Sequence, residues 1–138
     1  MNDDSRIQLA RDLFAAWSSG DADRPEVYLA PDAVLYDIVG GEHEGWSAIR
    51  DFFAKGIAVW PDLQLVPDQF WTNDEGVALS WVMSATVTDA AAGRLGQEAV
   101  GKKWSSEGMT WLRIQDGVVV REVDYHDSGA VERSLKTA

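Results

Sequence analysis

The sequence contains no cysteine, which excludes disulfide frameworks, thiolate metal sites and a cysteine nucleophile. No apolar run approaches the roughly 20 residues of a membrane span, and the acidic start, Met1-Asn2-Asp3-Asp4, is unlike a secretory signal. Basic residues are scarce, since 12 Lys and Arg face 23 Asp and Glu, with a formal net charge of -11. This charge repels phosphate backbones and anionic lipids. We therefore expect a cytoplasmic protein that binds neither nucleic acid nor a membrane.

Aromatic residues are plentiful, with seven Trp, four Phe and three Tyr in 138 residues. A Trp side chain combines a large apolar ring with one N–H group that needs a partner when buried. Most of these residues are expected in the core or at an interface, and as a set they also fit the lining of an apolar pocket. The length fits a single domain over residues 1–138.

Two amphipathic helices are predicted in the first half of the chain. Residues 4–19 carry apolar side chains at helical spacing and end before Gly20, and residues 45–59 do the same and end before Pro61. Between them, a short helical segment is predicted at residues 24–29 and an extended stretch at 33–38, which Gly40 and Gly41 close.

Strands are predicted in the second half, where β-branched and aromatic residues dominate. The turn sequences Asn73-Asp74-Glu75-Gly76 and Asp116-Gly117 predict hairpin connections. Residues 90–93 are expected to form a flexible hairpin tip, and the chain from Gly129 onward a short frayed tail. The predicted strands cover residues 63–72, 77–88, 102–115 and 118–126. Helices followed by an antiparallel meander predict an α+β fold.

Acidic side chains mark two of the extended segments. Alternation places Glu122, Asp124 and His126 on one face of the last strand. If this face points inward, desolvation raises the carboxyl pKa values and makes the acids candidates for proton transfer. The alternative, slightly favoured by the pattern alone, is a solvent-exposed face at the edge of the sheet. The same two alternatives, an inward or a solvent-exposed carboxyl group, apply to Asp37 in the extended stretch at residues 33–38.

Two stretches resemble known enzyme families. The run from Gly20-Asp21 through Asp32-Ala33-Val34-Leu35-Tyr36-Asp37-Ile38-Val39-Gly40, followed by Gly45-Trp46-Ser47-Ala48-Ile49-Arg50-Asp51-Phe52-Phe53, resembles the first half of bacterial ketosteroid isomerases, and Asp37 falls at their general base. The run Asp116-Gly117-Val118-Val119-Val120-Arg121-Glu122-Val123-Asp124-Tyr125-His126-Asp127 is similar to the terminal strand of limonene epoxide hydrolases. There Asp124 matches the catalytic aspartate, which has a counterpart in SnoaL-like polyketide cyclases.

The resemblance implies the nuclear-transport-factor-like fold that these three families share. We therefore expect a single SnoaL-like domain, in which a cone-shaped, curved antiparallel sheet wraps around the N-terminal helices and encloses an apolar pocket. Because the fold hosts many reactions, it does not define the chemistry.

Several positions differ from the catalytic residues of these families, and the differences indicate which reaction scheme fits this sequence. Leu13 stands where the isomerases place an oxyanion-binding Tyr, and Thr110 stands near the position of their protonated Asp. Trp81 and Met83 occupy the positions of the Arg and Asp that the epoxide hydrolases need. SnoaL-like cyclases need only a positioned acid–base carboxylate beside a cavity, so their scheme fits this sequence best.

The resulting hypothesis is an acid–base enzyme of isomerase, cyclase or lyase type that acts on an apolar, cyclic, carbonyl-containing substrate. In it Asp37 is the general base and Asp124 returns the proton or donates to the enolate oxygen, which Thr110 and Tyr36 help to hold, while His126 orients Asp124. The expected apolar walls are Phe14, Trp17, Phe53, Trp60, Leu79, Trp81, Met83 and Leu112.

Two other functions remain open. One is a binding module that holds a small hydrophobic molecule without chemistry, and the other is a dimerisation domain whose outer sheet face, with Trp111 and Tyr125, packs on a second copy. Neither a cofactor nor a metal is expected, because His126, Asp124 and Glu122 at alternate strand positions do not match a known zinc spacing.

Overall fold

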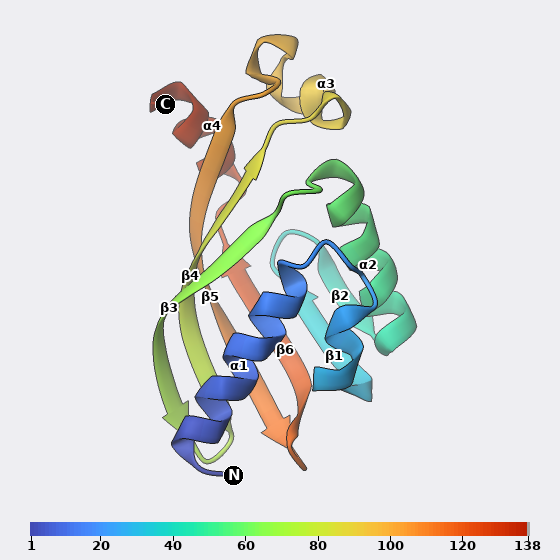
Figure 1. Ribbon diagram of the computed structural model, residues 1–138, viewed down its shortest axis with the longest axis vertical. Coiled ribbons are helices and arrows are strands. Elements are labelled where there is room, and N and C mark those ends of the chain that lie inside the picture. The colour runs from blue at the N-terminus through green and yellow to red at the C-terminus, as the bar shows by residue number, and fades with distance from the viewer. Residues whose placement is uncertain (138) are drawn as a thin grey trace.

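Six strands form one curved sheet in the computed structural model, which describes residues 1–137 (Figure 1). They lie in the order β2-β1-β6-β5-β4-β3. The strands are β1 (Leu29–Asp37), β2 (Gly41–Glu44), β3 (Gln64–Asn73), β4 (Gly76–Thr86), β5 (Lys103–Gln115) and β6 (Val118–His126). Neighbours are antiparallel except for β1 and β6, which are parallel. The last strand is therefore central and not at an edge.

Helix α1 (Asp3–Trp17) lies across one face of the sheet, here called the inner face (Figure 1). The side chain of Asn2 caps the helix by accepting a hydrogen bond from the Ser5 N–H at 2.8 Å. Two acidic residues in the first turn also stabilise the helix, because their negative charges lie at the positive end of the helix dipole. The buried side of the helix carries Leu9, Ala10, Leu13, Phe14, Ala16 and Trp17. This confirms the helix predicted at residues 4–19.

Helix α2 (Trp46–Val59) lies beside β1 and β2, and it confirms the helix predicted at residues 45–59. Gly45 precedes it with a φ of +82°, a conformation that glycine adopts without the steric cost of a Cβ atom. The short helical segment is also confirmed, as the 3-10 helix η1 (Arg24–Tyr28).

The predicted hairpins are confirmed at both turns. The side-chain oxygen of Asn73 accepts hydrogen bonds from the N–H groups of Glu75 and Gly76 at 2.8 and 3.1 Å. Asp116 and Gly117 have φ values of 53° and 80°, as a two-residue turn between twisted antiparallel strands requires. Strand β1 begins at residue 29, four residues before the predicted stretch, and β2 was not expected from its sequence, Gly-Glu-His-Glu.

The prediction of a frayed tail is wrong, because the chain from Gly129 forms helix α4 (Gly129–Thr137). Its first turn is fixed by the Asp127 carboxylate, which accepts a hydrogen bond from the Gly129 N–H at 2.9 Å. Val131 is buried against the far end of β5, and Glu132 forms an ion pair with Arg94 at 3.0 Å. Tertiary contacts therefore order a segment whose local sequence is weakly structured.

The predicted flexible tip at residues 90–93 is also more ordered than expected. It lies within three short helical turns, η2 (Asp89–Ala91), α3 (Ala92–Leu95) and η3 (Gln97–Ala99). Ala91 and Ala99 are buried, so these turns pack on the ends of the strands that they join.

Two hydrophobic clusters support the sheet. The larger fills the space between α1 and the inner face, and it contains Leu13, Phe14, Leu79, Leu112 and Val119. The smaller lies at the far ends of β4 and β5, under α3 and α4, and is built on Trp104 and Val131. No helix in the described part of the chain is long and apolar enough to cross a membrane. The predicted α+β fold with a curved sheet around the N-terminal helices is confirmed.

Candidate active site

A cavity of about 400 Å³ lies between the inner face of the sheet and helices α1 and α2. Most of its lining is apolar, which lowers the local polarity around any charged group that faces it. The apolar lining residues are Phe14, Trp17, Leu35, Phe52, Phe53, Leu63, Leu65, Trp81 and Met83. The polar ones are Asp37, Thr110, Glu122, Asp124 and His126 on the sheet and Lys55 on α2.

The acidic side chains meet because of strand register. Asp37 on β1 pairs with Asp124 on β6, which in turn pairs with Thr110 on β5. Adjacent strands are about 4.8 Å apart, so these three side chains form one row on the same face. Glu122 and His126 follow on that face because alternate strand residues point the same way. The inward orientation of the polar face is thus confirmed, and the solvent-exposed alternative is wrong.

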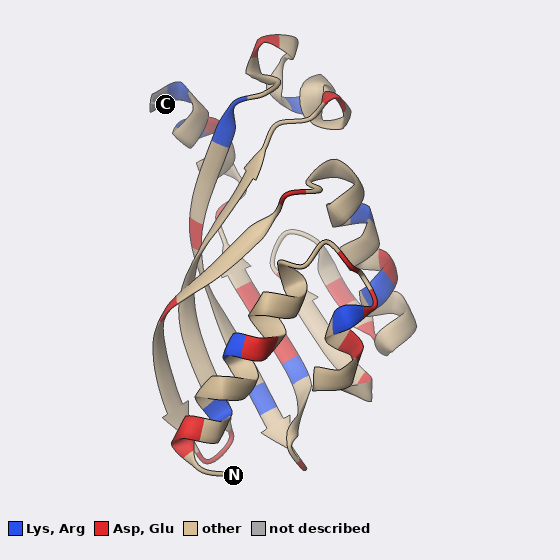
Figure 2. Cartoon of the chain, viewed as in Figure 1, with Lys and Arg blue, Asp and Glu red and all other residues tan. Residues whose placement is uncertain are grey.

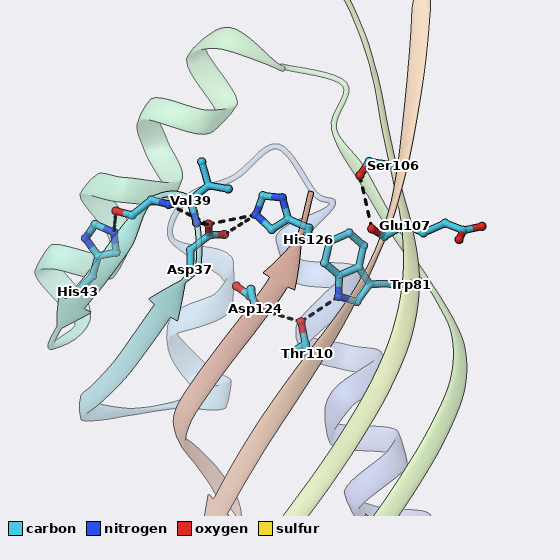
Figure 3. A network of polar contacts seen from close by, with 10 residues as sticks. Asp37, Val39, His43, Trp81, Ser106, Glu107, Thr110, Asp124 and His126 are labelled. Atoms are coloured by element: carbon cyan, nitrogen blue, oxygen red, sulfur yellow. Dashed lines mark hydrogen bonds and ion pairs between the residues drawn. The ribbon is translucent and has the colours of Figure 1, made fainter. Parts of the chain in front are cut away.

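Asp37 and His126 form one half of the site (Figure 3). The Nε2 atom of His126 lies 3.0 and 3.1 Å from the two carboxylate oxygens of Asp37, and each side chain is only 14% exposed. The backbone N–H groups of Val39 and Gly40 also donate to Asp37, at 2.8 and 2.9 Å. Burial opposes ionisation of Asp37, but the hydrogen bonds and charge of His126 and the backbone donors outweigh it and lower the pKa.

The same contact acts on the imidazole. The hydrogen bond from His126 to Asp37 raises the pKa of His126 above its usual value, against the opposing effect of burial. The contact therefore favours the imidazolium form of His126, with Asp37 as its counter-ion. The sequence-based expectation that His126 orients Asp124 needs correction, because its hydrogen bonds go to Asp37.

Asp124 is held by a chain of donors (Figure 3). The hydroxyl of Thr110 donates to Asp124 at 2.6 Å, and the indole N–H of Trp81 donates to the Thr110 oxygen at 2.9 Å. Burial raises the pKa of Asp124 to about 6, although hydrogen bonds from Glu122 and Thr110 pull it down. At neutral pH this group is a carboxylate that is far more basic than an ordinary Asp.

Gly108 makes room for this chain. It lies on β5 opposite both Trp81 and His126, and a Cβ atom added there would be 2.3 Å from the Trp81 ring. Because Gly108 has no side chain, the indole crosses over β5 and brings its N–H group to Thr110. Sequence reasoning did not identify this glycine, since its role depends on a neighbouring strand.

Glu122 is also buried in the site, with 4% of its surface exposed. Its carboxyl group accepts a hydrogen bond from the Trp17 indole at 3.1 Å and shares another with Asp124. Burial, followed by the charge of Asp124, raises the pKa of Glu122 well above its usual value. The raised pKa favours the neutral form of Glu122, which can donate a hydrogen bond to Asp124. Strand alternation had made Glu122 a candidate for proton transfer beside Asp124, but the catalytic scheme expected from the sequence gave it no role.

Five of the eight residues predicted to form the apolar walls of the pocket line the cavity, and three do not. Phe14, Trp17, Phe53, Trp81 and Met83 line the cavity, as predicted. Leu79 and Leu112 do not, because they are fully buried in the core. Trp60 packs edge-on against Trp104 in the smaller cluster, with ring centroids 5.1 Å apart.

Tyr36 does not reach the site. It neighbours Asp37 on β1, so its side chain points to the opposite face of the sheet. There its ring contacts Tyr125 edge-on, with centroids 6.4 Å apart. The expectation that Tyr36 helps to hold a substrate oxygen is corrected by this placement.

Comparison with known structures identifies the same fold in bacterial proteins. A candidate polyketide cyclase from Xanthomonas campestris pv. campestris is 22% identical with a TM-score of 0.82, over 98% of this chain and 99% of the other. A Catenulispora acidiphila protein with a ketosteroid isomerase-like fold, in complex with trimethylamine, is 15% identical with a TM-score of 0.80, over 94% and 92%. AclR, a candidate hydroxylase from Streptomyces galilaeus, is 24% identical with a TM-score of 0.78, over 99% and 88%.

At these identities the similarity to solved structures shows the fold alone. A search of curated proteins found no match to this chain. The family model described as the SnoaL-like domain matches residues 10–122, which include β1, β5 and the first half of β6. Because this match covers most of the chain, the protein belongs to the SnoaL-like domain family.

Proposed function

We propose that this protein is an acid–base enzyme that moves a proton on an apolar, cyclic substrate with a carbonyl group, as an isomerase or cyclase does. The observation that carries the proposal is Asp124, a carboxyl with a pKa of about 6 in an apolar cavity, beside the ion pair of His126 and Asp37. A base whose pKa lies close to neutral pH is mostly deprotonated at that pH and is still basic enough to accept a proton from a substrate.

In the proposed reaction, Asp124 takes a proton from the carbon next to the substrate carbonyl. The electron pair of that C–H bond forms the C=C bond of an enolate, and negative charge develops on the carbonyl oxygen. The imidazolium of His126 stabilises this charge. In an isomerase the protonated Asp124 returns the proton to another carbon. In a cyclase the enolate carbon attacks a second carbonyl, whose oxygen receives the proton.

This assignment differs from the one expected from sequence, in which Asp37 was the base. Asp37 accepts hydrogen bonds from three donors, the Nε2 atom of His126 and the N–H groups of Val39 and Gly40, and its pKa is lowered, so it is a weaker base than Asp124. Its role in the proposal is to keep His126 charged. Thr110 and the neutral Glu122 hold the Asp124 carboxylate between two donors. The SnoaL-like domain match is consistent with a cyclase or isomerase of this kind, and a candidate polyketide cyclase shares the fold.

The test uses proton exchange, which needs no knowledge of the natural substrate. Cyclic ketones such as 2-tetralone are incubated with the protein in D₂O, and loss of the α-proton signal is followed by NMR. We expect Asp124→Asn to lower the rate at least about 100-fold, as loss of a general base does. Glu107→Gln, an exposed acid on β5, is the control and should keep the wild-type rate.

The pH dependence adds a second criterion. The wild-type exchange rate should rise as pH increases through about 6, where Asp124 ionises. Full activity in Asp124→Asn would refute the assignment. If the wild-type protein binds the ketones but exchanges none of them, the binding-module alternative is correct.

For the assembly, we propose a homodimer formed through the outer face of the sheet. Met109 and Tyr125 pair there across β5 and β6 and are 44% and 53% exposed, and Trp111 lies on the same face. Exposed apolar residues that cluster on one face are typical of an interface. Sedimentation should give twice the monomer mass for the wild type and the monomer mass for Tyr125→Arg. A monomeric wild type at micromolar concentration would refute the proposal.

A further inference from the structure

Lys55 and Gly56 are consecutive residues of α2 that both line the cavity, and we call this pair the mouth. Lys55 is exposed, whereas Glu122, which also lines the cavity, is 4% exposed. Because Lys55 places a positive charge at the edge of an apolar cavity, we infer that the substrate carries an anionic group, such as a carboxylate. This group binds Lys55 while the ring system occupies the cavity. The inference rests on the proposed function only for the placement of the reacting carbon beside Asp124.

Gly56 is unusual because nothing in the protein requires a glycine there. It lies inside a helix without a positive φ, and a Cβ atom added to it would have no neighbour within 4 Å. A glycine inside a helix lowers its stability relative to alanine. The missing side chain therefore leaves space at the mouth, which a substrate longer than the cavity would occupy.

Lys55 is the one Lys or Arg among the residues that line the cavity, within the described part of the chain. It forms no ion pair with any residue that the structure describes. The strongest effects on the pKa values of Asp37, Asp124 and His126 come from groups other than Lys55. Its ammonium group is thus available to a ligand.

The distribution of charge fixes the direction in which such a substrate binds. The sheet side of the cavity holds the carboxylates of Asp37 and Asp124, which repel an anion, and the charge of His126 there is already paired with Asp37. Acidic residues are also spread over the helices and strands, with a net charge of -11 (Figure 2). A carboxylate is therefore stabilised best beside a cation that has no carboxylate partner, and Lys55 meets this condition whereas His126 is paired with Asp37.

Two ligands of nearly equal shape test the inference. These are 6-hydroxy-2-naphthoate and the neutral 6-hydroxy-2-naphthamide, and their dissociation constants are measured at low salt by quenching of Trp fluorescence. The wild type should bind the carboxylate about three- to fivefold more tightly, the size that an exposed ion pair supports. Lys55→Met should remove the preference, and Lys55→Arg should retain it.

Glycine variants test the space at the mouth. Gly56→Ala should raise Tm by about 2 to 5 °C through helix propensity, yet weaken binding of both ligands. Gly93→Ala is the matched control, since Gly93 is also helical with no neighbour within 4 Å but does not line the cavity. It should leave both dissociation constants unchanged.

Three results would overturn the inference: equal affinity of the wild type for both ligands, a carboxylate preference that persists in Lys55→Met, or no binding of either ligand at millimolar concentration. The outcome is separable from that of the proposed function. Asp124→Asn should lose proton exchange but keep the preference for the carboxylate. A wild type with the preference and without exchange would refute the enzyme and leave the anion site in place.

Discussion

Replacing Asp124 with Asn should stabilise the fold at high pH while it destroys the proposed activity. The carboxyl has a pKa of about 6 in the folded protein against 3.8 for an ordinary Asp. Between these values the folded state binds more protons than the unfolded state, so the stability of the wild type falls as pH rises. The full difference corresponds to at most about 3 kcal/mol above pH 7, and a neutral Asn does not lose it.

The assay is urea unfolding of both proteins from pH 4 to pH 8, followed by Trp fluorescence. The difference in the free energy of unfolding should widen in favour of the variant as pH rises, and level off above about pH 7. Asp51→Asn, an exposed carboxyl on α2, should show no such trend. A difference that stays constant with pH, or a wild type that is more stable than Asp124→Asn at pH 8, would refute the explanation of the raised pKa.

Other variants probe the remaining contacts. Gly108→Ala should push the Trp81 ring away from its hydrogen bond and cost about 1 to 3 kcal/mol in urea unfolding, and a variant as stable as the wild type would contradict the close contact. Asp37→Asn should lower the pKa of His126, measured by NMR titration of the imidazole, because its main hydrogen-bond acceptor loses its charge. An unchanged titration would show that the ion pair does not form in solution. Deleting residues 129–138 should lower Tm by several degrees, since Val131 covers part of the smaller core, and an unchanged Tm would mean that α4 adds nothing.

The elements that the sequence predicts well are those with strong local signals. The two long helices have apolar stripes and stop residues, and the hairpin at Asp116-Gly117 has a turn that only a few residue types form. Strand β2 and helix α4 carry weak signals, because β2 is held by its pairing with β1 and α4 by the burial of Val131. Local propensity does not contain such contacts.

The features of the site also fall into those that local sequence predicts and those that depend on contacts between distant segments. Alternation along one strand put Glu122, Asp124 and His126 together correctly, and the same rule applied to Asp37 would have turned Tyr36 away. The partner of His126 is 89 residues distant, and the space over Gly108 depends on a side chain from another strand. These facts follow from strand order and register, which periodicity within a strand does not determine.

Because β6 lies between β1 and β5, the cavity is completed late during synthesis. A chain that ends before residue 118 has β1 without its parallel neighbour and β5 without one of its two, so both present open edges that invite aggregation. It also lacks Asp124 and His126 and leaves Asp37 in water. Pairing between the first and last strands is slow to form because the chain between them is long. Ligand binding by nascent chains of increasing length would therefore begin only when residues 118–126 have left the ribosome.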